Sequence, residues 1–249
     1  LGRLKDRAAV PLLAETLKRH ADPDTGNLFL AEAAAEALGG IGSPEAEAAL
    51  IETFSGLKDY PLFTNWYGDH EALMACHASP VHLRIVEALD TLASTNAAAL
   101  IPHLIRCVPT DPDRALFPEN DDAETLVGRV IRRQGAEARV TETCLAVLGD
   151  PQAARDKDIE AALGRVHGAW AGTPDIENRA AQILSLVCRD RQYAPRVQGA
   201  FERYAALTND IPRVFDKGIP VVLKLPARHW VCFYLGRAIG MLGDVRSID

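Results

Sequence analysis

Apolar side chains recur along this chain every three to four residues, which is the spacing of one face of an α-helix. Three segments repeat the same pattern of apolar and small residues at positions i, i+4 and i+8, and each ends in glycine or alanine. They are residues 30–42, 81–93 and 231–243. Glycine after the last apolar position favours a left-handed backbone that ends a helix. The pattern therefore predicts a unit of helix, tight turn and second helix.

Second helices are predicted after such turns, over residues 6–13, 43–50 and 96–104. Pro11 and Pro102 fall at equivalent places, and Pro44 follows Ser43, a candidate N-cap. Proline suits the first turn of a helix because the amides there have no intrahelical acceptor. Five further helices are predicted over residues 123–134, 136–148, 156–170, 175–188 and 195–207. The chain should thus form about five or six helix pairs.

Three short segments carry a family resemblance. Leu4-Lys5-Asp6-x-x-Ala9-Val10-Pro11-Leu12, Ala37-Leu38-Gly39-x-Ile41-Gly42 and Leu242-Gly243-Asp244-x-Arg246 resemble the short HEAT repeats of the phycobilisome-lyase-like class. The resemblance implies an all-α fold, a right-handed α-α superhelix of the HEAT/armadillo-like kind, with residues 1–249 as a single helical-repeat domain. The class usually has an arginine in the first helix, where this chain has Ala31, His82 and Cys232, and a glycine where it has Lys5. Both ends fall inside a repeat motif, so we expect a segment of a longer protein.

Long insertions near residues 56–80, 109–122 and 208–226 interrupt the repeats. Insertions in helical-repeat proteins form loops on which binding surfaces are built. We therefore predict a non-catalytic protein–protein interaction scaffold, whose concave second-helix face and 56–80 loop contact another protein or another domain of the parent chain. The predicted partner-binding residues are Tyr60, Phe63, Trp66, Tyr67, His70, His77, Arg228 and Trp230.

A HEAT-type enzyme is the alternative. A bilin-lyase-like enzyme would use the His- and Trp-rich region 66–82, with a cavity between Trp66, His70 and His77. A DNA-glycosylase-like enzyme would use the Arg228–Trp230 region, with Trp230 exposed in a basic groove. Region 66–82 also holds Tyr67, Asp69, Glu71, Cys76 and His82. No His-Glu-x-x-His spacing occurs, and His70-Glu71 is a single pair. We therefore predict no metal, no cofactor and no catalytic residue. A metal bound by His70, His77 and Cys76 remains an open alternative.

The charge, the hydropathy and the cysteine content of the chain limit the classes of partner that it could bind. The chain has a net charge of −7, which disfavours nucleic acid because phosphate binding depends on clustered lysine and arginine. The exception is Arg129, Arg132, Arg133 and Arg139, which we interpret as a solvated helix face. No apolar run reaches the roughly 18 residues that span a bilayer, so no membrane contact is expected. The five cysteines are widely spaced in apolar segments, as in a reducing compartment, so we expect a cytoplasmic protein.

Overall fold

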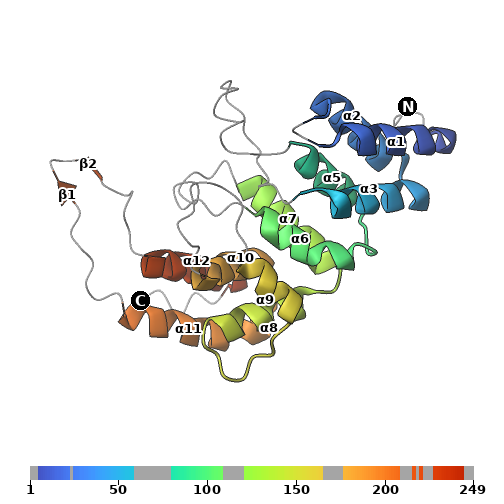
Figure 1. The fold of residues 1–249 in the computed structure, drawn as a ribbon. Coiled ribbons are helices and arrows are strands. Elements are labelled where there is room, and N and C mark those ends of the chain that lie inside the picture. The colour runs from blue at the N-terminus through green and yellow to red at the C-terminus, as the bar shows by residue number, and fades with distance from the viewer. Residues whose placement is uncertain are drawn as a thin grey trace. The chain divides into compact units, whose positions relative to one another are not determined.

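The computed structural model describes residues 5–22, 25–58, 80–108, 121–164, 176–207, 215–216, 219–220 and 227–243. Most of these residues are helical (Figure 1). The α-helices are α1 (Val10–His20), α2 (Leu28–Ile41), α3 (Pro44–Gly56), α5 (Pro80–Thr91), α6 (Ile101–Cys107), α7 (Asp121–Arg133), α8 (Glu137–Val147), α9 (Lys157–Leu163), α10 (Ile176–Val187), α11 (Ala194–Ala206) and α12 (Ala227–Leu242). Short 3-10 helices are η2 (Arg7–Ala9), η3 (Ala98–Leu100) and η6 (Arg191–Tyr193). The all-α class predicted from the sequence is confirmed.

A small antiparallel hairpin lies within the third predicted insertion. It pairs β1 (Phe215–Asp216) with β2 (Ile219–Pro220), and Phe215 lies opposite Pro220. The rest of the three insertions falls mostly outside the described residues. Among the described helices, none is long and apolar enough to cross a membrane.

The described helices fall into two compact units. The first unit holds α1, α2, α3, α5, α6 and α7, and the second holds α8 to α12 with the hairpin. Each unit has its own buried apolar core, which includes Leu38, Leu50 and Ile85 in the first and Leu145, Ile183 and Val197 in the second. A single domain over residues 1–249 and a superhelix with right-handed sense remain predictions.

The first unit stacks its helices in two layers. One layer holds the predicted first helices, because α2 packs against α5 and α5 packs against α7. The other holds second helices, because α1 contacts α3, and α3 contacts η3, which leads into α6. The α2–α5 contact is close: a Cβ built on Gly39 would lie 2.8 Å from the Cβ of Ala88.

The turns that follow the first helices share a left-handed residue. Gly42 ends α2 with a φ of 70°, and Gly243 follows α12 with a φ of 70°. Ala93, which the sequence pattern aligns with these glycines, has a φ of 50° after α5. Lys5, which stands where a glycine is usual, also has a φ of 50°. The predicted turn positions are therefore confirmed even where a side chain makes the left-handed backbone costly.

The second helices also begin alike. The side chains of Asp6 and Asp190 cap η2 and η6 by accepting a backbone N–H, and each 3-10 turn runs on into an α-helix. Ser43 caps α3 in the same way, accepting the N–H of Ala46 at 3.2 Å. The helices α1, α6 and α11 carry a proline in their first turn: Pro11, Pro102 and Pro195. The predicted second-helix entry is thus confirmed.

In the second unit, α10 lies between α8 and α12, while α11 packs against both of these helices. The α10 helix is buried from Arg179 through Val187, as expected for a central element. The predicted helix over residues 156–170 is shorter in the structure, because α9 ends at Leu163. Gly164 occupies the C-cap, where its N–H bonds to the carbonyl of Glu160. Glycine is a poor helix former, which explains the early end.

Candidate functional site

One candidate site is the exposed side of two adjacent second helices, which we call the second-helix surface. It consists of Pro11, Leu12, Glu15, Lys18 and Arg19 on α1 and of Glu45, Ala48 and Glu52 on α3. The α1 helix turns Val10, Leu13 and Leu17 into the core of the first unit. Residues between these positions therefore face solvent.

Leu12 is the large apolar residue of the second-helix surface, with 65% of the residue exposed. Pro11 beside it is also exposed. The sequence pattern did not reveal this, because Val10-Pro11-Leu12-Leu13 is apolar throughout. The only signal was that Leu12 falls off the helical stripe formed by Val10 and Leu13.

Charged side chains of α1 and α3 form two ion pairs on the second-helix surface. Lys18 reaches across from α1 to Glu52 of α3, with 3.2 Å between Nζ and Oε1. Arg19 pairs with Glu15 within α1, with 2.9 Å between Nη2 and Oε1. All four side chains are mostly exposed, so these pairs orient the side chains more than they stabilise the fold. The second-helix surface therefore combines one exposed apolar side chain with paired charges, and protein–protein contact surfaces combine apolar and polar groups in this way.

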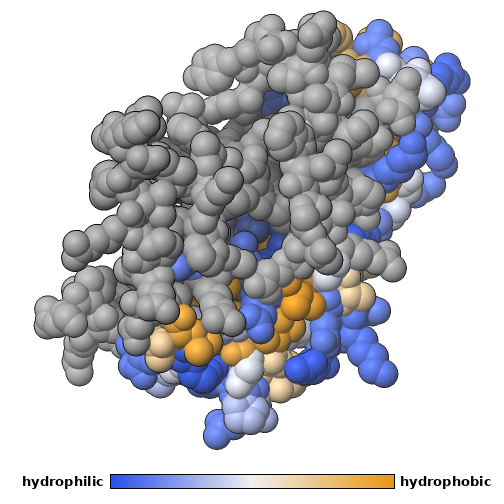
Figure 2. All heavy atoms as spheres, turned by 60° about the vertical axis from the view of Figure 1, so that its left-hand side comes forward, coloured by the Kyte–Doolittle hydropathy of each residue, from blue (hydrophilic) through white to orange (hydrophobic). Residues whose placement is uncertain are grey.

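Other large apolar side chains also reach the surface. Among the described residues, these are Phe29 and Leu30 of the first unit and Leu207, Phe233 and Met241 of the second. Figure 2 shows one face of the molecule on which hydrophobic residues, in orange, are open to solvent beside hydrophilic ones, in blue. Single exposed apolar residues are common on protein surfaces, so these residues alone do not define a binding site.

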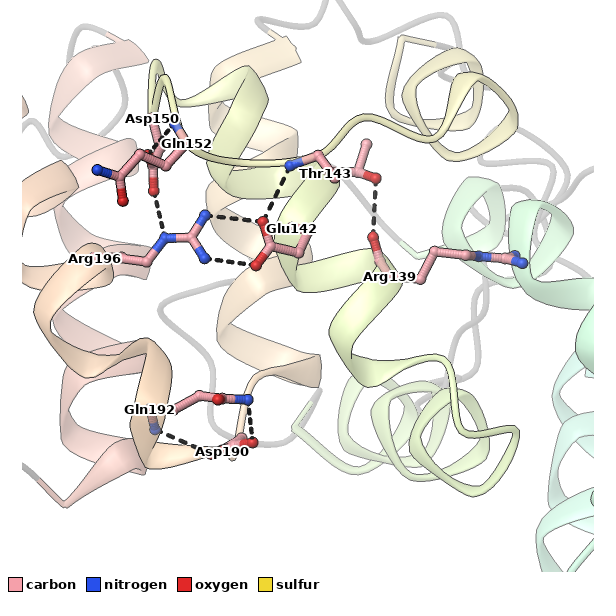
Figure 3. A network of polar contacts seen from close by, with 9 residues as sticks. Arg139, Glu142, Thr143, Asp150, Gln152, Asp190, Gln192 and Arg196 are labelled. Atoms are coloured by element: carbon pink, nitrogen blue, oxygen red, sulfur yellow. Dashed lines mark hydrogen bonds and ion pairs between the residues drawn. The ribbon is translucent and has the colours of Figure 1, made fainter.

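A second candidate site is a polar network in the second unit (Figure 3). Arg196 of α11 donates from its two terminal nitrogens to the Glu142 carboxylate on α8, at 2.5 and 2.9 Å. Its Nε donates to Asp150 in the loop after α8, at 2.7 Å. Glu142 also accepts the backbone N–H of Ala154 at 3.1 Å, and the Arg196 guanidinium lies 5.6 Å from the ring centroid of Tyr193. The network therefore ties two helices and a loop together.

Arg196 keeps both carboxylates of the network ionised. Its hydrogen bonds hold the pKa of Glu142 below the ordinary value, against the opposing effect of burial. Burial opposes ionisation of Asp150, but the hydrogen bond and charge of Arg196, with the N–H of Gln152, outweigh it and lower the pKa. Since a general acid or base needs a pKa near the working pH, these shifts suit a structural clamp rather than proton transfer.

The arginine-rich segment 129–139 is paired with acidic residues. Arg129 and Arg133 of α7 both reach Asp90 at the end of α5, with nitrogen–oxygen distances of 3.1 and 2.6 Å. Arg139 of α8 lies 3.2 Å from Asp156. All three arginines are exposed, in agreement with the solvated helix face predicted for them.

Most of the predicted partner-binding residues cannot be placed. Tyr60, Phe63, Trp66, Tyr67, His70 and His77 lie outside the described residues, as does Cys76. His82 is described, and it is 1% exposed. Its Nε2 donates to the Lys58 carbonyl at 2.8 Å, and its ring packs edge-on to Phe54 at 5.4 Å. His82 therefore joins the end of α3 to α5.

Metal-ligand clusters were sought in the part of the chain that the structure describes. No group of three or more His, Cys, Asp or Glu residues there is arranged to hold a metal ion. This result does not test a metal site at His70, His77 and Cys76, because those residues lie outside the described ranges.

Trp230 lies in the core of the second unit. It is 5% exposed, and its ring centroid lies 5.8 Å from that of Phe233 and 6.5 Å from that of Tyr234. A ring packed in this way is not available to a partner or to a nucleic-acid base. The side chain of Arg228 lies outside the described part. The accessible aromatic residue on α12 is Phe233, which is 41% exposed.

Three of the described cysteines are buried: Cys107, Cys144 and Cys188. Burial raises the pKa of Cys188 to about 11, and it raises the pKa of Cys144 as well. Both groups are therefore thiols at neutral pH, and thiols are poor nucleophiles. These three cysteines act as small apolar core residues, as the sequence predicted.

Comparison with known families adds one finding. Residues 30–55 match the family model of the PBS lyase HEAT-like repeat. The matched segment runs through α2, the left-handed Gly42 and nearly all of α3, so it is one helix–turn–helix unit. No curated protein and no solved structure matched the chain. The match therefore identifies residues 30–55 as a PBS-lyase HEAT-like repeat, within a chain whose described part is built mainly of helices.

Proposed function

We propose that this protein is a non-catalytic interaction scaffold, and that its second-helix surface binds another protein or another domain of the parent chain. The observation that carries the proposal is Leu12, which is 65% exposed on a surface that also carries two ion pairs. Covering a fully exposed leucine contributes about 1.5–3 kcal/mol, so an occupant with an apolar side chain at this position gains part of that free energy. Charges of both signs on the same two helices favour a protein over a polyanion or a membrane.

The 56–80 segment belongs to the same proposal. It begins at the C-terminal end of α3, which is one of the two helices of the second-helix surface. The residues Tyr60, Phe63, Trp66, Tyr67, His70 and His77 would extend the contact from this end. In the second unit, Arg228 is retained as a separate candidate, whereas Trp230 is buried. The net charge of −7 favours a protein partner over nucleic acid, and the buried thiols suit the cytoplasm.

The test compares the proteins captured by three tagged forms of the chain: the native sequence, Leu12→Glu and Leu207→Glu. Both leucines are exposed, Leu12 on α1 and Leu207 at the end of α11, so neither substitution disturbs a core. We expect a partner that the native chain and Leu207→Glu retain equally, and that Leu12→Glu loses at least about tenfold, or about 1.4 kcal/mol. Equal retention by Leu12→Glu contradicts the second-helix surface. A covalent change in the retained partner contradicts a non-catalytic scaffold.

A further inference from the structure

Within the described residues, the chain passes from the first unit to the second between Gly135 and Ala136. Gly135 follows α7 of the first unit, and Ala136 occupies the N-cap of α8 in the second. Gly135 has a left-handed backbone with a φ of 65°, and its N–H donates to the Arg132 carbonyl at 2.9 Å. The connection between these two helices is therefore a short turn around one glycine.

The residue before Gly135 is bonded to the first unit. The side chain of Gln134 spans the turn that follows α5. Its Nε2 donates to the Ser94 carbonyl at 2.7 Å, and its Oε1 accepts the N–H of Ala97 at 2.8 Å. Both hydrogen bonds are partly buried, where they are electrostatically stronger than in water. Because one amide is held at both of its ends, Gln134 moves with the first unit.

The residue after Ala136 is bonded to the second unit. The Glu137 carboxylate accepts the backbone N–H of Arg189 at 2.5 Å and that of Asp190 at 2.8 Å. These two residues form the turn between α10 and η6. Hydrogen bonds to an ionised acceptor are about twice as strong as neutral ones. Since α8 itself also packs against α10, Glu137 moves with the second unit.

Gly135 and Ala136 are the two residues between these anchors. A Cβ built on Gly135 meets no atom within 4 Å, so the space beside the glycine is open. The turn at Gly42 is different, because α2 and α3 on its two sides pack against each other inside one unit. Gly149 is as open as Gly135, but it joins α8 and α9, which also pack together within one unit. Glycine adopts positive and negative φ about equally well, so rotation at Gly135 costs little.

We propose that Gly135 and Ala136 form a hinge about which the two units turn as separate bodies. Hinges are a few loop or helix-end residues that absorb a change in φ and ψ while the packed elements on either side stay intact. The motion breaks none of the hydrogen bonds of Gln134 and Glu137, because each of these side chains is bonded within its own unit. A partner that contacts both units would hold the hinge at one angle.

The test measures distances between pairs of spin labels by pulsed dipolar spectroscopy. The labels are attached to unnatural amino acids, so the five native cysteines stay in place. One pair lies within the first unit, at Ala8 and Ala98, and one lies within the second, at Ala161 and Ala206; all four positions are exposed. The third pair, Ala98 and Ala161, spans the hinge. Its distance distribution should be at least about twice as wide as that of either pair within a unit.

Two matched variants locate the motion. Gly135→Asn should narrow the distribution across the hinge, because asparagine tolerates the left-handed turn but has less φ and ψ freedom than glycine. Gly149→Asn makes the same change at a φ of 86° inside the second unit, so it should leave all three distributions as in the native chain. If circular dichroism shows that Gly135→Asn has lost helix, Gln134→Ala takes its place and should widen the distribution across the hinge, because it frees one anchor.

Two results would overturn the proposal. One is a native distribution across the hinge that is as narrow as those within the units. The other is the absence of the expected change in the Gly135→Asn chain, or in the Gln134→Ala chain where that variant replaces it.

Discussion

Gly39 of α2 lies directly against Ala88 of α5. A Cβ on Gly39 would come within 2.8 Å of the Cβ and 3.1 Å of the Cα of Ala88, distances that side-chain rotation cannot relieve. The glycine therefore sets how closely the two first helices approach, inside the repeat that matches the family model. This contact is the best-defined packing relationship in the first unit.

Substitution Gly39→Ala should lower the free energy of unfolding by about 1–3 kcal/mol, because the new methyl group must push α2 and α5 apart. The loss should appear even though alanine is the better helix former by about 1 kcal/mol. Urea unfolding measures the change. The matched control is Gly40→Ala, one residue further on the exposed side of α2, which should leave stability unchanged or raise it. Equal effects of the two substitutions would show that the helices do not meet at Gly39.

Substitution Ala93→Gly should raise the free energy of unfolding by about 0.5–1 kcal/mol, because Ala93 holds a φ of 50° that glycine adopts without strain. The converse change, Gly42→Ala, should cost about 1 kcal/mol through its left-handed backbone, since its Cβ would meet only Leu92 at an ordinary 3.6 Å. Thermal and urea unfolding both report these changes. As a control, Ala48→Gly in the exposed middle of α3 should destabilise by about 1 kcal/mol. Destabilisation by Ala93→Gly would contradict the left-handed turn.

The Arg196 network should make the second unit sensitive to acid. Glu142 and Asp150 both have a pKa below the ordinary value in the folded chain. A carboxylate whose pKa falls on folding binds more protons when unfolded, so its stabilisation is complete above the ordinary pKa near 4 and is lost as the pH falls through the lowered one. The free energy of unfolding should therefore decline as the pH drops from about 5 towards 2.

The double variant Glu142→Gln, Asp150→Asn tests this origin. At pH 7 it should lose about 1–3 kcal/mol, because Arg196 is left with neutral partners in a site that is only about a quarter exposed. Its stability should then change less than that of the native chain between pH 5 and pH 2. Parallel pH profiles for the two proteins would contradict the assignment to these carboxylates.

Asp90 should keep the arginine-rich face of α7 from attracting polyanions. Substitution Asp90→Ala removes the acceptor shared by Arg129 and Arg133, so the variant should elute from heparin at higher salt than the native chain. The stability cost should be modest, about 0.5–1 kcal/mol, because both arginines are more than a third exposed. Asp158→Ala on α9 removes the same charge without freeing these arginines. An equal shift for both variants would indicate a net-charge effect alone.

Much of the fold could be predicted from the sequence, because helical periodicity and turn chemistry are local. The apolar pattern over residues 81–93 predicts a turn at residue 93. In the structure Ala93 has a left-handed backbone there, although alanine does not favour this conformation. The first-turn proline Pro102 likewise marked the start of a second helix. Only the helix over 156–170 was overextended, since its apolar pattern continues past Gly164, where the helix ends.

The candidate sites were harder to predict because they depend on contacts between distant segments. Arg196 meets Glu142 across 54 residues of sequence, and nothing in either local pattern links them. Trp230 was named among the candidate partner-binding residues, and the structure shows that it packs against Phe233 and Tyr234 inside the second unit. Leu12 was hidden in an apolar run, and only the pairing of α1 with its neighbours shows which leucine faces solvent.

The central claim is that the second-helix surface binds a protein, and the most direct measurement is photo-crosslinking from position 12. A benzophenone side chain replaces Leu12 in one protein and the equally accessible Leu207 in another. Mass spectrometry then identifies the adducts formed after illumination in the native cell extract. The account predicts one recurrent protein adduct from position 12 that is absent from position 207. The same background of adducts from both positions would contradict it.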